Sequence, residues 1–173
     1  MKVNGDHYQS IWYDEKIDQV KIIDQRLLPY EFKVIIVETL ENFENAIKEM
    51  AVRGAPLIGA TAAFGIARQM LRDPSNKNLD LSWDRLNQTR PTAINLKWAL
   101  DRCRNHLLNT HLNDRGHEAM RLALEISTED VEINKNIGLN GLEIIKSIAK
   151  NKPDGEPIRL LTHCNAGWLA TVD

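Results

Sequence analysis

The stretch PLIGATAAFGIARQMLR, residues 56–72, is apolar on almost every side of a helix. A helix on the surface of a globular protein shows one apolar stripe, whereas a helix that is apolar all round is buried. The sequence DPSN at 73–76 is expected to end this helix. We therefore predict a buried helix at the centre of a helical domain that spans residues 39–150.

Other segments of residues 39–150 also have helical periodicity. With Thr39 as a cap, a first helix places Phe43 and Met50 on one face. Another helix is expected over 91–109, and its inward face includes Cys103. A last helix begins near residue 113 and reaches about residue 150. Its glycines at positions 138 and 141 lie on one side and are expected to allow close approach of a neighbouring backbone.

Residues 1–38 are predicted to form a small N-terminal β unit. Residues 11–13 and 20–23 are rich in β-branched and aromatic side chains, and the polar residues 14–16 between them suggest a hairpin. Residues 34–37 follow as another β-branched strand. The fold class up to residue 150 is therefore α+β.

The end of the chain indicates a change of fold class. Residues 151–157, with the sequence NKPDGEP, are expected to be a linker. The apolar residues 158–161 predict a buried strand that ends at the sequence THCNAG. Functional groups of open α/β sheets lie beyond the carboxyl ends of strands. We expect residues 158–173 to be the first strand of a truncated Rossmann-like domain, so that the chain is the front half of a longer protein.

Composition excludes several classes of function. A net charge of -2 gives no reason to expect nucleic acid or an anionic membrane as partner. No apolar run approaches the roughly 20 residues of a membrane span. Two cysteines make no disulfide framework, and no CxxC or HxxxH spacing suggests a metal site. We expect a cytoplasmic, reduced protein without a metal site.

Two arginines precede prolines that are suited to the first helical position. Arg53 stands before the Gly-Ala-Pro of 54–56, and Arg90 stands before Pro91. The start of a helix carries unpaired N–H groups and about half a positive charge, so an arginine there is unfavourable unless an anion binds. The alternative is that each arginine forms an ion pair with an acid elsewhere. The repetition of the pattern favours a phosphate or carboxylate site.

Cys164 is the candidate for chemistry. Residues 165–167 should turn the chain into a helix directly after it, and a helix start stabilises a thiolate. The alternative is that Cys164 is a small buried hydrophobe, which is the expected role of Cys103. The neighbouring His163 is more typical of a hydrogen-bonded structural residue.

Three motifs together resemble one family. They are RGAP at 53–56, RPTA at 90–93 and LTHCNAG at 161–167. In this order and spacing they resemble the methylthioribose-1-phosphate isomerases, and the similarity runs from about Trp12 to Ala170. This family is related to the regulatory α, β and δ subunits of eukaryotic translation initiation factor 2B. Ribose-1,5-bisphosphate isomerase is a closer relative than these subunits, and it is the alternative enzyme that the motifs could indicate.

The resemblance implies an isomerisation in methionine salvage, in which 5-methylthioribose 1-phosphate becomes 5-methylthioribulose 1-phosphate without a cofactor. Arg53, Gly54, Ala55 and Arg90 match the positions that hold the substrate phosphate. Cys164 matches the active-site cysteine, either as a base at the migrating hydrogen or as a stabiliser of the transition state. We expect the full-length form to be a homodimer.

The resemblance also implies a missing part. The family continues for a roughly equal length and carries an aspartate acid/base in its second half. We therefore expect this chain alone to be inactive, and expect the unpaired edge of the strand at 158–161 to favour self-association. The alternative from another class is a non-catalytic regulatory or assembly module, in which the helices of 92–150 form an interaction surface.

Overall fold

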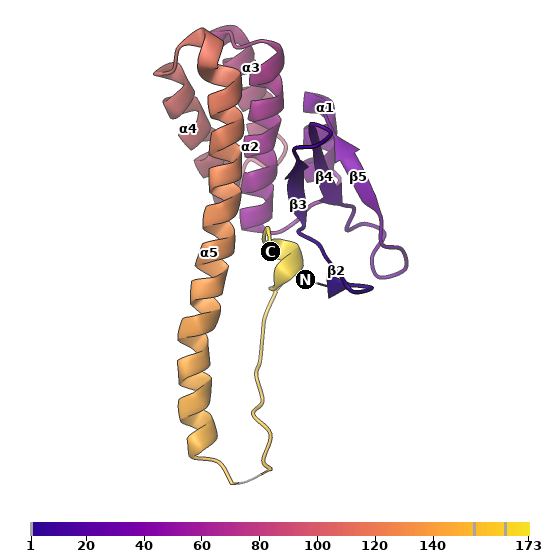
Figure 1. Ribbon diagram of the computed structural model, residues 1–173, viewed down its shortest axis with the longest axis vertical. Helices are drawn as coiled ribbons and strands as arrows, with labels where there is room; N and C mark the ends of the chain where they lie inside the picture. Colours follow the sequence, from indigo (N-terminus) through magenta and orange to yellow (C-terminus); the bar gives the residue numbers. More distant parts are fainter. Residues whose placement is uncertain (1, 154, 165) are drawn as a thin grey trace.

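The N-terminal part of the computed structural model consists of two small antiparallel sheets (Figure 1). The structure describes residues 2–153, 155–164 and 166–173. The predicted hairpin is confirmed as β3 and β4, with Ile11 opposite Ile22, and β5 pairs with β4. The strands are β1 Lys2–Val3, β2 Asp6–His7, β3 Ile11–Asp14, β4 Gln19–Ile23 and β5 Val34–Val37.

The short hairpin of β1 and β2 was not predicted. Its two-residue turn is formed by Asn4 and Gly5, which have φ angles of 53° and 97°. Asn-Gly is the residue pair that favours such a turn, because both positions require positive φ. The dipeptide was therefore the local signal that could have found this hairpin.

The remainder of the chain is built around one buried helix, as predicted. Twelve of the residues of α2 are buried, and α1, α3, α4 and α5 all pack against it. Figure 1 shows α2, α3, α4 and α5 running side by side, with directions that alternate along the chain. The helices are α1 Leu40–Lys48, α2 Ala55–Arg72, α3 Asn76–Asn87, α4 Ile94–Leu108 and α5 Arg115–Lys150, with the 3₁₀ turns η1 Leu112–Asp114 and η2 Trp168–Ala170.

Local signals explain where the helices begin. The Thr39 side chain accepts from the N–H of Asn42, whose own side chain accepts from the N–H of Thr39, so α1 has the predicted cap. Helix α3 was not predicted, because residues 73–76 were interpreted only as the end of α2. Ser75 also caps α3, since its Oγ accepts from the N–H of Asn78 at 3.2 Å.

Two details of the predicted helices differ. Met50 lies beyond the end of α1 at φ 58° and is 53% exposed, so it does not share the buried face of Phe43. Helix α4 begins at Ile94 rather than at 91. Its inward face is as expected, and every predicted member is fully buried: Leu96, Ala99, Leu100, Cys103 and Leu107.

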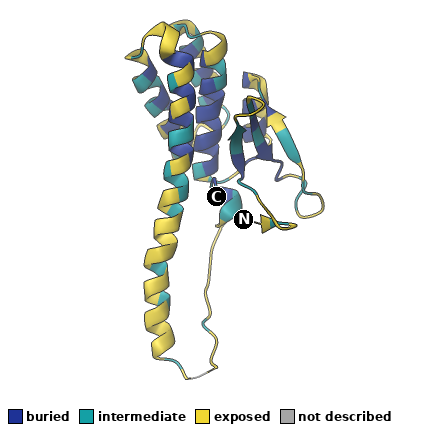
Figure 2. Ribbon diagram, viewed as in Figure 1, coloured by how far each residue is buried: buried dark blue, intermediate teal, exposed yellow. Residues whose placement is uncertain are grey.

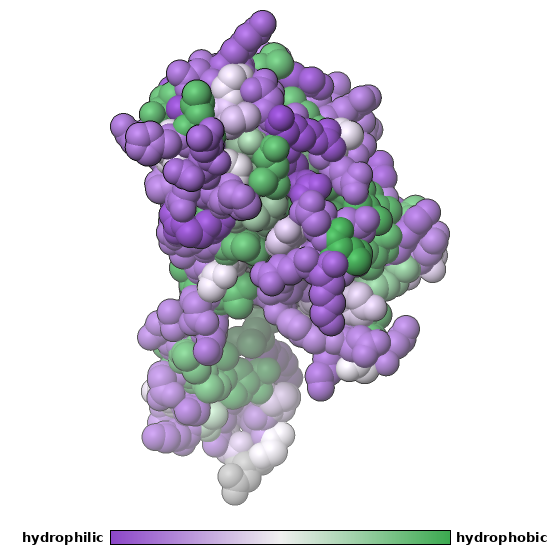
Figure 3. All heavy atoms as spheres, turned by 45° about the horizontal axis from the view of Figure 1, so that its top comes forward, coloured by the Kyte–Doolittle hydropathy of each residue, from purple (hydrophilic) through white to green (hydrophobic). Residues whose placement is uncertain are grey.

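Helix α5 is continuous and extends well beyond the other helices (Figures 1 and 2). Its first part packs on α2, and after Ser127 none of its residues is buried. No described atom outside the helix lies within 4 Å of a Cβ placed on Gly138 or Gly141, so the expected close neighbour is absent from this chain. Figure 3 shows hydrophobic side chains on this distal part, and the large exposed ones are Ile133, Ile137, Leu139, Leu142, Ile144 and Ile148.

The predicted strand over 158–161 is wrong. These residues have no regular secondary structure, and Leu160 and Leu161 are 74% and 100% exposed. A strand needs a partner for its backbone hydrogen bonds, and no other described strand lies beside this segment. The strand edge that was expected to favour self-association is therefore absent.

The chain returns to the bundle at its end. Figure 1 shows the segment after α5 running back alongside it, and η2 packs against α2. Val172 is fully buried there. Among the described residues, no helix has the length and apolar character that crossing a membrane would require.

Candidate functional site

Two of the predicted motifs meet at one end of the helical bundle. Helices α2 and α4 both begin at the end where the chain terminus lies (Figure 1). Their starts are close, because a Cβ placed on Gly59 would lie 2.9 Å from the carbonyl oxygen of Asn95. The packing therefore brings the segments that carry Arg53 and Arg90 to the same end.

The start of α2 has the features predicted for an anion site. Gly54 is the N-cap residue at φ 101°, and no side chain caps the helix. Pro56 lies in the first turn and has no N–H of its own. A Cβ on Gly54 would lie 2.4 Å from the Cα of Ala170, so only glycine fits between α2 and η2. Among α1, α2 and α3, this is the one start without a side-chain cap.

The start of α4 is also uncapped but differs from the prediction. Pro91 is not the first helical residue, because it lies in a turn in which the N–H of Ala93 donates to the carbonyl of Arg90 at 2.9 Å. Ala93 is the N-cap and supplies no side-chain hydrogen bond. Arg90 therefore precedes the helix by one turn and does not sit directly at its first residue.

Arg53 and Arg90 are both exposed, and neither makes an ion pair with any residue that the structure describes. Other arginines of the chain do: Arg85 binds Glu44, and Arg102 binds Glu129. The alternative that the two arginines form structural ion pairs has no support within the described chain. Two free guanidinium groups beside two uncapped helix starts favour an anion.

Cys164 and Cys103 have opposite environments. Cys103 is buried, and this burial raises the pKa of its thiol to about 12. Cys164 is exposed, and its backbone has φ 64°, which is uncommon for a residue other than glycine. Such strained conformations cost on the order of 1–3 kcal/mol and occur often at functional sites. Within this chain Cys164 is therefore not a buried hydrophobe, in contrast to Cys103.

The helix expected directly after Cys164 is not formed. Part of this turn, residue 165, lies outside the described residues. Gly167 has φ 111°, and only the single 3₁₀ turn η2 follows it. The argument that an α-helix start stabilises the thiolate therefore does not apply within this chain. Among the described residues, no hydrogen bond or ion pair joins Cys164 to Arg53 or Arg90.

The segment after Cys164 is held by side chains that sequence analysis did not single out. The backbone N–H of Ser10 donates to the carbonyl of Val172 at 2.8 Å, and its Oγ donates to the carbonyl of Trp168 at 3.0 Å. Nε2 of Gln25 donates to the carbonyl of Leu169 at 2.7 Å. Ser10 and Gln25 are both buried. Their burial is known only from the structure, so the one sequence signal was a polar residue close to each of the apolar strands β3 and β4.

Asp130 of α5 holds the same segment from the other side. Its Oδ2 accepts from the N–H of Val172 at 2.7 Å, and its Oδ1 accepts from Nδ2 of Asn134 at 3.1 Å. Burial raises the pKa of the Asp130 carboxyl, although these two hydrogen bonds act in the opposite direction. The β unit and α5 together fix the end of the chain against the start of α2.

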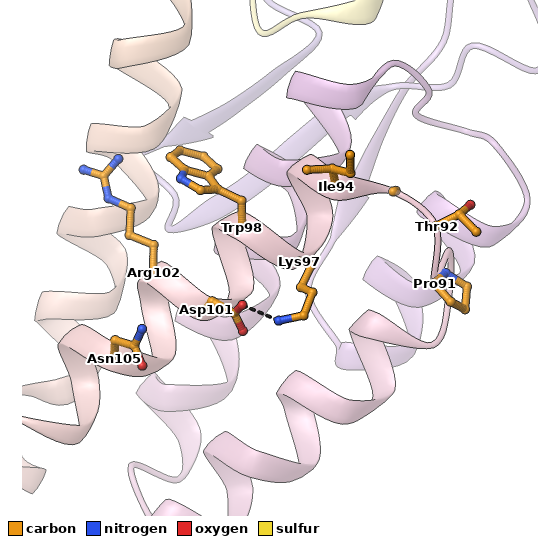
Figure 4. Close-up of a pocket in the computed structure, with 9 residues that line it drawn as sticks. Pro91, Thr92, Ile94, Lys97, Trp98, Asp101, Arg102 and Asn105 are labelled. Carbon is orange, nitrogen blue, oxygen red and sulfur yellow. Dashed lines mark hydrogen bonds and ion pairs between the residues drawn. The ribbon is translucent and has the colours of Figure 1, made fainter.

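An open groove of about 530 Å³ lies beside the start of α4 (Figure 4). Ile94 and Trp98 give it an apolar wall and are 83% and 48% exposed. Its cations are engaged, since Lys97 pairs with Asp101, and the Arg102 guanidinium lies 5.6 Å from the centre of a Trp98 ring. The groove therefore offers apolar contact next to Arg90 rather than a second anion site. In the described part of the chain no cluster of side chains could hold a metal ion.

The sequence matches the Initiation factor 2 subunit family over residues 51–172. This chain belongs to that family. The match includes all three motifs described above and most of the helical bundle.

Two curated relatives of this chain are named as isomerases. Over all 173 residues the chain is 54% identical to a methylthioribose-1-phosphate isomerase of Brucella anthropi and 49% identical to one of Escherichia coli. It covers 48% and 47% of these relatives, so it spans about half their length. The matched part is their N-terminal half. The predicted resemblance to this family is confirmed.

Two solved structures share the fold. The first is 5-methylthioribose 1-phosphate isomerase of Pyrococcus horikoshii, with a TM-score of 0.78 and 39% identity over 96% of this chain and 46% of that chain. The second is translation initiation factor eIF-2B subunit delta of A. fulgidus, with a TM-score of 0.79 and 36% identity over 96% of this chain and 48% of that chain. Members of both kinds have this fold, so the site residues must decide the function.

Proposed function

We propose that this chain is the N-terminal half of an aldose–ketose isomerase that converts 5-methylthioribose 1-phosphate to 5-methylthioribulose 1-phosphate in methionine salvage. Relatives named for this activity match the chain over its whole length. The observation that carries the proposal is that Arg53 and Arg90 have no ion-pair partner among the described residues and lie at the end of the bundle to which the segment after Cys164 returns.

The start of α2 and the loop before α4 form the proposed phosphate site. The guanidinium groups of Arg53 and Arg90 supply charge, and free N–H groups at the uncapped helix starts supply further donors. Gly54 lets Ala170 pack against the helix start, and the exposed Ala55 leaves its backbone accessible to the phosphate. This arrangement holds the phosphate on C1 while the sugar ring extends away from the helix.

Cys164 acts on the sugar in this proposal. The bond between C1 and the ring oxygen breaks as that oxygen gains a proton, and a hydrogen then moves from C2 to C1. The C2 hydroxyl becomes the ketone, so substrate and product are isomers and no redox partner is required. Cys164 serves either as a thiolate base at the migrating hydrogen or as a neutral thiol that stabilises the transition state. The acid that protonates the ring oxygen belongs to the second half of the enzyme.

The organisation and setting of the protein are part of the same proposal. Residues 1–38 form the β unit, 39–150 the helical domain and 151–157 the linker, while 158–173 begin a Rossmann-like catalytic domain. The full-length form is a cytoplasmic homodimer that acts on a small sugar phosphate and binds neither nucleic acid nor membrane.

A chimaera tests this proposal directly. We define it as residues 1–173 of this chain joined to the second half of the Brucella anthropi relative. It should isomerise 5-methylthioribose 1-phosphate, whereas the chain alone should give no turnover. Ribose 1,5-bisphosphate, assayed in parallel, should be converted more slowly. A folded chimaera without activity on 5-methylthioribose 1-phosphate, or a preference for the bisphosphate, would contradict the proposed substrate.

Variants of the chimaera test the roles of individual residues. Cys164→Ser should lower kcat at least about 100-fold, as expected for loss of a proton-transferring group. Arg53→Met should raise KM at least about tenfold, because charged hydrogen bonds contribute about 1.5–3 kcal/mol. Arg85→Met is the matched control, since Arg85 binds Glu44 away from the site, and it should change neither constant more than about twofold.

The second candidate is a regulatory or assembly module. It is favoured by the likeness to the initiation factor subunit of A. fulgidus. Such a module would need the arginines but not the thiol of Cys164. If the chimaera binds the sugar phosphate and Cys164→Ser changes neither binding nor any turnover, the regulatory function is supported and the isomerase is not.

A further inference from the structure

We propose that Gln25 is a positioning residue, whose side-chain amide fixes the segment that follows Cys164 relative to the phosphate site at Gly54. The inference rests on the proposed isomerase, because it assigns a residue of the β unit to that reaction. Gln25 lies in the loop after β4 and belongs to none of the three motifs.

The hydrogen bonds of Gln25 join two parts of the site. Its backbone N–H donates to the carbonyl of Ala51 at 2.9 Å, immediately before the segment that carries Arg53. Its side-chain Nε2 donates to the carbonyl of Leu169 at 2.7 Å, in the turn after Cys164. The residue is only 5% exposed, so both bonds are shielded from water. A single residue therefore sets the separation of the two segments.

The packing around this bond leaves little freedom for the segment. Ala170 follows Leu169 and lies against Gly54, where a Cβ would be 2.4 Å from its Cα. Gly54 is held at the start of α2, so a displacement of the Leu169 carbonyl would alter the path of the chain toward Cys164. The Cys164 backbone is already in an unfavourable region at φ 64°, so it needs such external support.

The other side chains that hold this segment do not reach the arginine segment. The Ser10 hydroxyl donates to the carbonyl of Trp168, and its backbone N–H donates to the carbonyl of Val172, while the Ser10 carbonyl accepts from Ile23 within the β unit. Asp130 of α5 accepts from the N–H of Val172. These contacts attach the end of the chain to the protein. Only Gln25, among the described residues, links it by hydrogen bonds to the backbone next to Arg53.

An unpaired atom also argues that Gln25 is not present for stability alone. Its Oε1 is buried and has no hydrogen-bond partner among the described residues. Leaving such an acceptor unsatisfied costs about 1–3 kcal/mol, which offsets much of what the Nε2 bond contributes. Nε1 of Trp168, next to Leu169, is likewise buried without a described partner. An apolar side chain of the same size would serve stability nearly as well.

Two matched variants of the chimaera test the proposal. Gln25→Met keeps the shape of the side chain and removes the donor to Leu169. Gln69→Met is its control, because Nε2 of Gln69 is also buried without a described partner but lies in α2 near its far end. We expect Gln25→Met to lower kcat about tenfold or more with KM within about twofold, and Gln69→Met to change neither. Urea unfolding at the assay temperature must show both variants fully folded.

Gln25→Glu supplies a signature that a purely structural role would not give. A protonated glutamic acid can donate to the Leu169 carbonyl, whereas a carboxylate cannot. The kcat of this variant relative to the unsubstituted chimaera should therefore fall as the pH rises. A ratio that stays constant with pH, in a folded variant, would overturn the positioning role.

Hydrogen exchange separates failure of this inference from failure of the proposed function. In the chain itself, Gln25→Met should speed exchange of the Ala170 and Val172 amides at least about fivefold and leave those of α3 unchanged, while Gln69→Met should not. If the chimaera is inactive but this result is obtained, the isomerase proposal fails and the structural link stands without its catalytic role. If the chimaera is active and Gln25→Met retains full kcat and normal exchange, the positioning role is wrong.

Discussion

The two parts of helix α5 both carry regularly spaced apolar residues but have opposite environments. Up to Ser127 the helix packs against α2, with residues such as Ala123 and Ile126 buried. Beyond Ser127 it has apolar residues just as regularly, but Ile133 and Ile137 are more than half exposed. The difference shows that burial along one helix depends on what lies beside it. In Figure 2, α5 becomes mainly yellow, the colour of exposed residues, beyond the point where α2 lies beside it.

The exposed part is nevertheless organised as a contact face. At 100° per residue, Ile133, Ile137, Ile144 and Ile148 fall within an arc of about 60°. Scattered apolar residues on a surface need no explanation, but a continuous stripe indicates an interaction face. No described residue covers it, in a chain that spans about half the length of the relatives it matches.

The contrast between the packed bundle and the exposed segments predicts its largest effect for the alkylation rates of the two cysteine thiols. Iodoacetamide should alkylate Cys164 at least about a thousandfold faster than Cys103 in the native chain, because Cys103 reacts only when the domain opens, at a cost of at least about 5 kcal/mol. Mass spectrometry of timed samples measures both rates. Comparable rates would mean that the bundle around α4 is not packed as described.

Matched isoleucines test the two parts of α5 directly. Ile126→Ala should lower the free energy of unfolding by about 3 kcal/mol, because Ile126 is 4% exposed and a cavity would remain. Ile137→Ala, at 64% exposure, should change it by less than about 0.5 kcal/mol. Urea unfolding of the chain gives both values. Equal losses would show that the distal part is buried in solution, for instance against a second copy.

Matched glycines in the same helix should give effects of opposite sign. A Cβ on Gly116 would lie 2.9 Å from Leu71 Cδ2 and 3.1 Å from the Leu71 Cα, so Gly116→Ala should destabilise the chain by about 1–2 kcal/mol. Gly138 has open space, and Gly138→Ala should stabilise the helix by up to about 1 kcal/mol. Thermal unfolding followed by circular dichroism distinguishes the two. A destabilising Gly138→Ala would indicate a close neighbour in solution.

The smallest effect concerns Asp130, where the buried part of α5 ends. Burial raises its pKa, so its contribution to stability is complete below the unfolded-state pKa and is lost as the pH rises through the folded-state pKa. Asp130→Asn cannot ionise, and its stability relative to the original chain should rise between about pH 4 and pH 7. Urea midpoints across this range provide the test. A relative stability that falls with pH would show that the carboxylate is the favoured form.

Much of the fold could be predicted because its signals are local. The all-round apolar character of 56–72 indicated the central helix, and the spacing of apolar residues in 94–108 indicated the face that contains Cys103. Helix α3 was missed although Ser75 is an ordinary cap, since residues 73–76 serve as the end of one helix and the start of the next. The strand over 158–161 was wrong because an apolar run forms a strand only beside a partner.

By itself, the sequence determined helices α1, α2, α4 and α5, the Thr39 cap, the motifs around Arg53, Arg90 and Cys164, and the family to which the chain belongs. These depend on neighbours a few positions away or on direct comparison of residues. Only the tertiary structure decided that the starts of α2 and α4 lie at one end, and that Ser10 and Gln25 hold a segment more than 140 positions away. Hydrogen bonds over such separations follow from how the layers pack, and no local propensity encodes them.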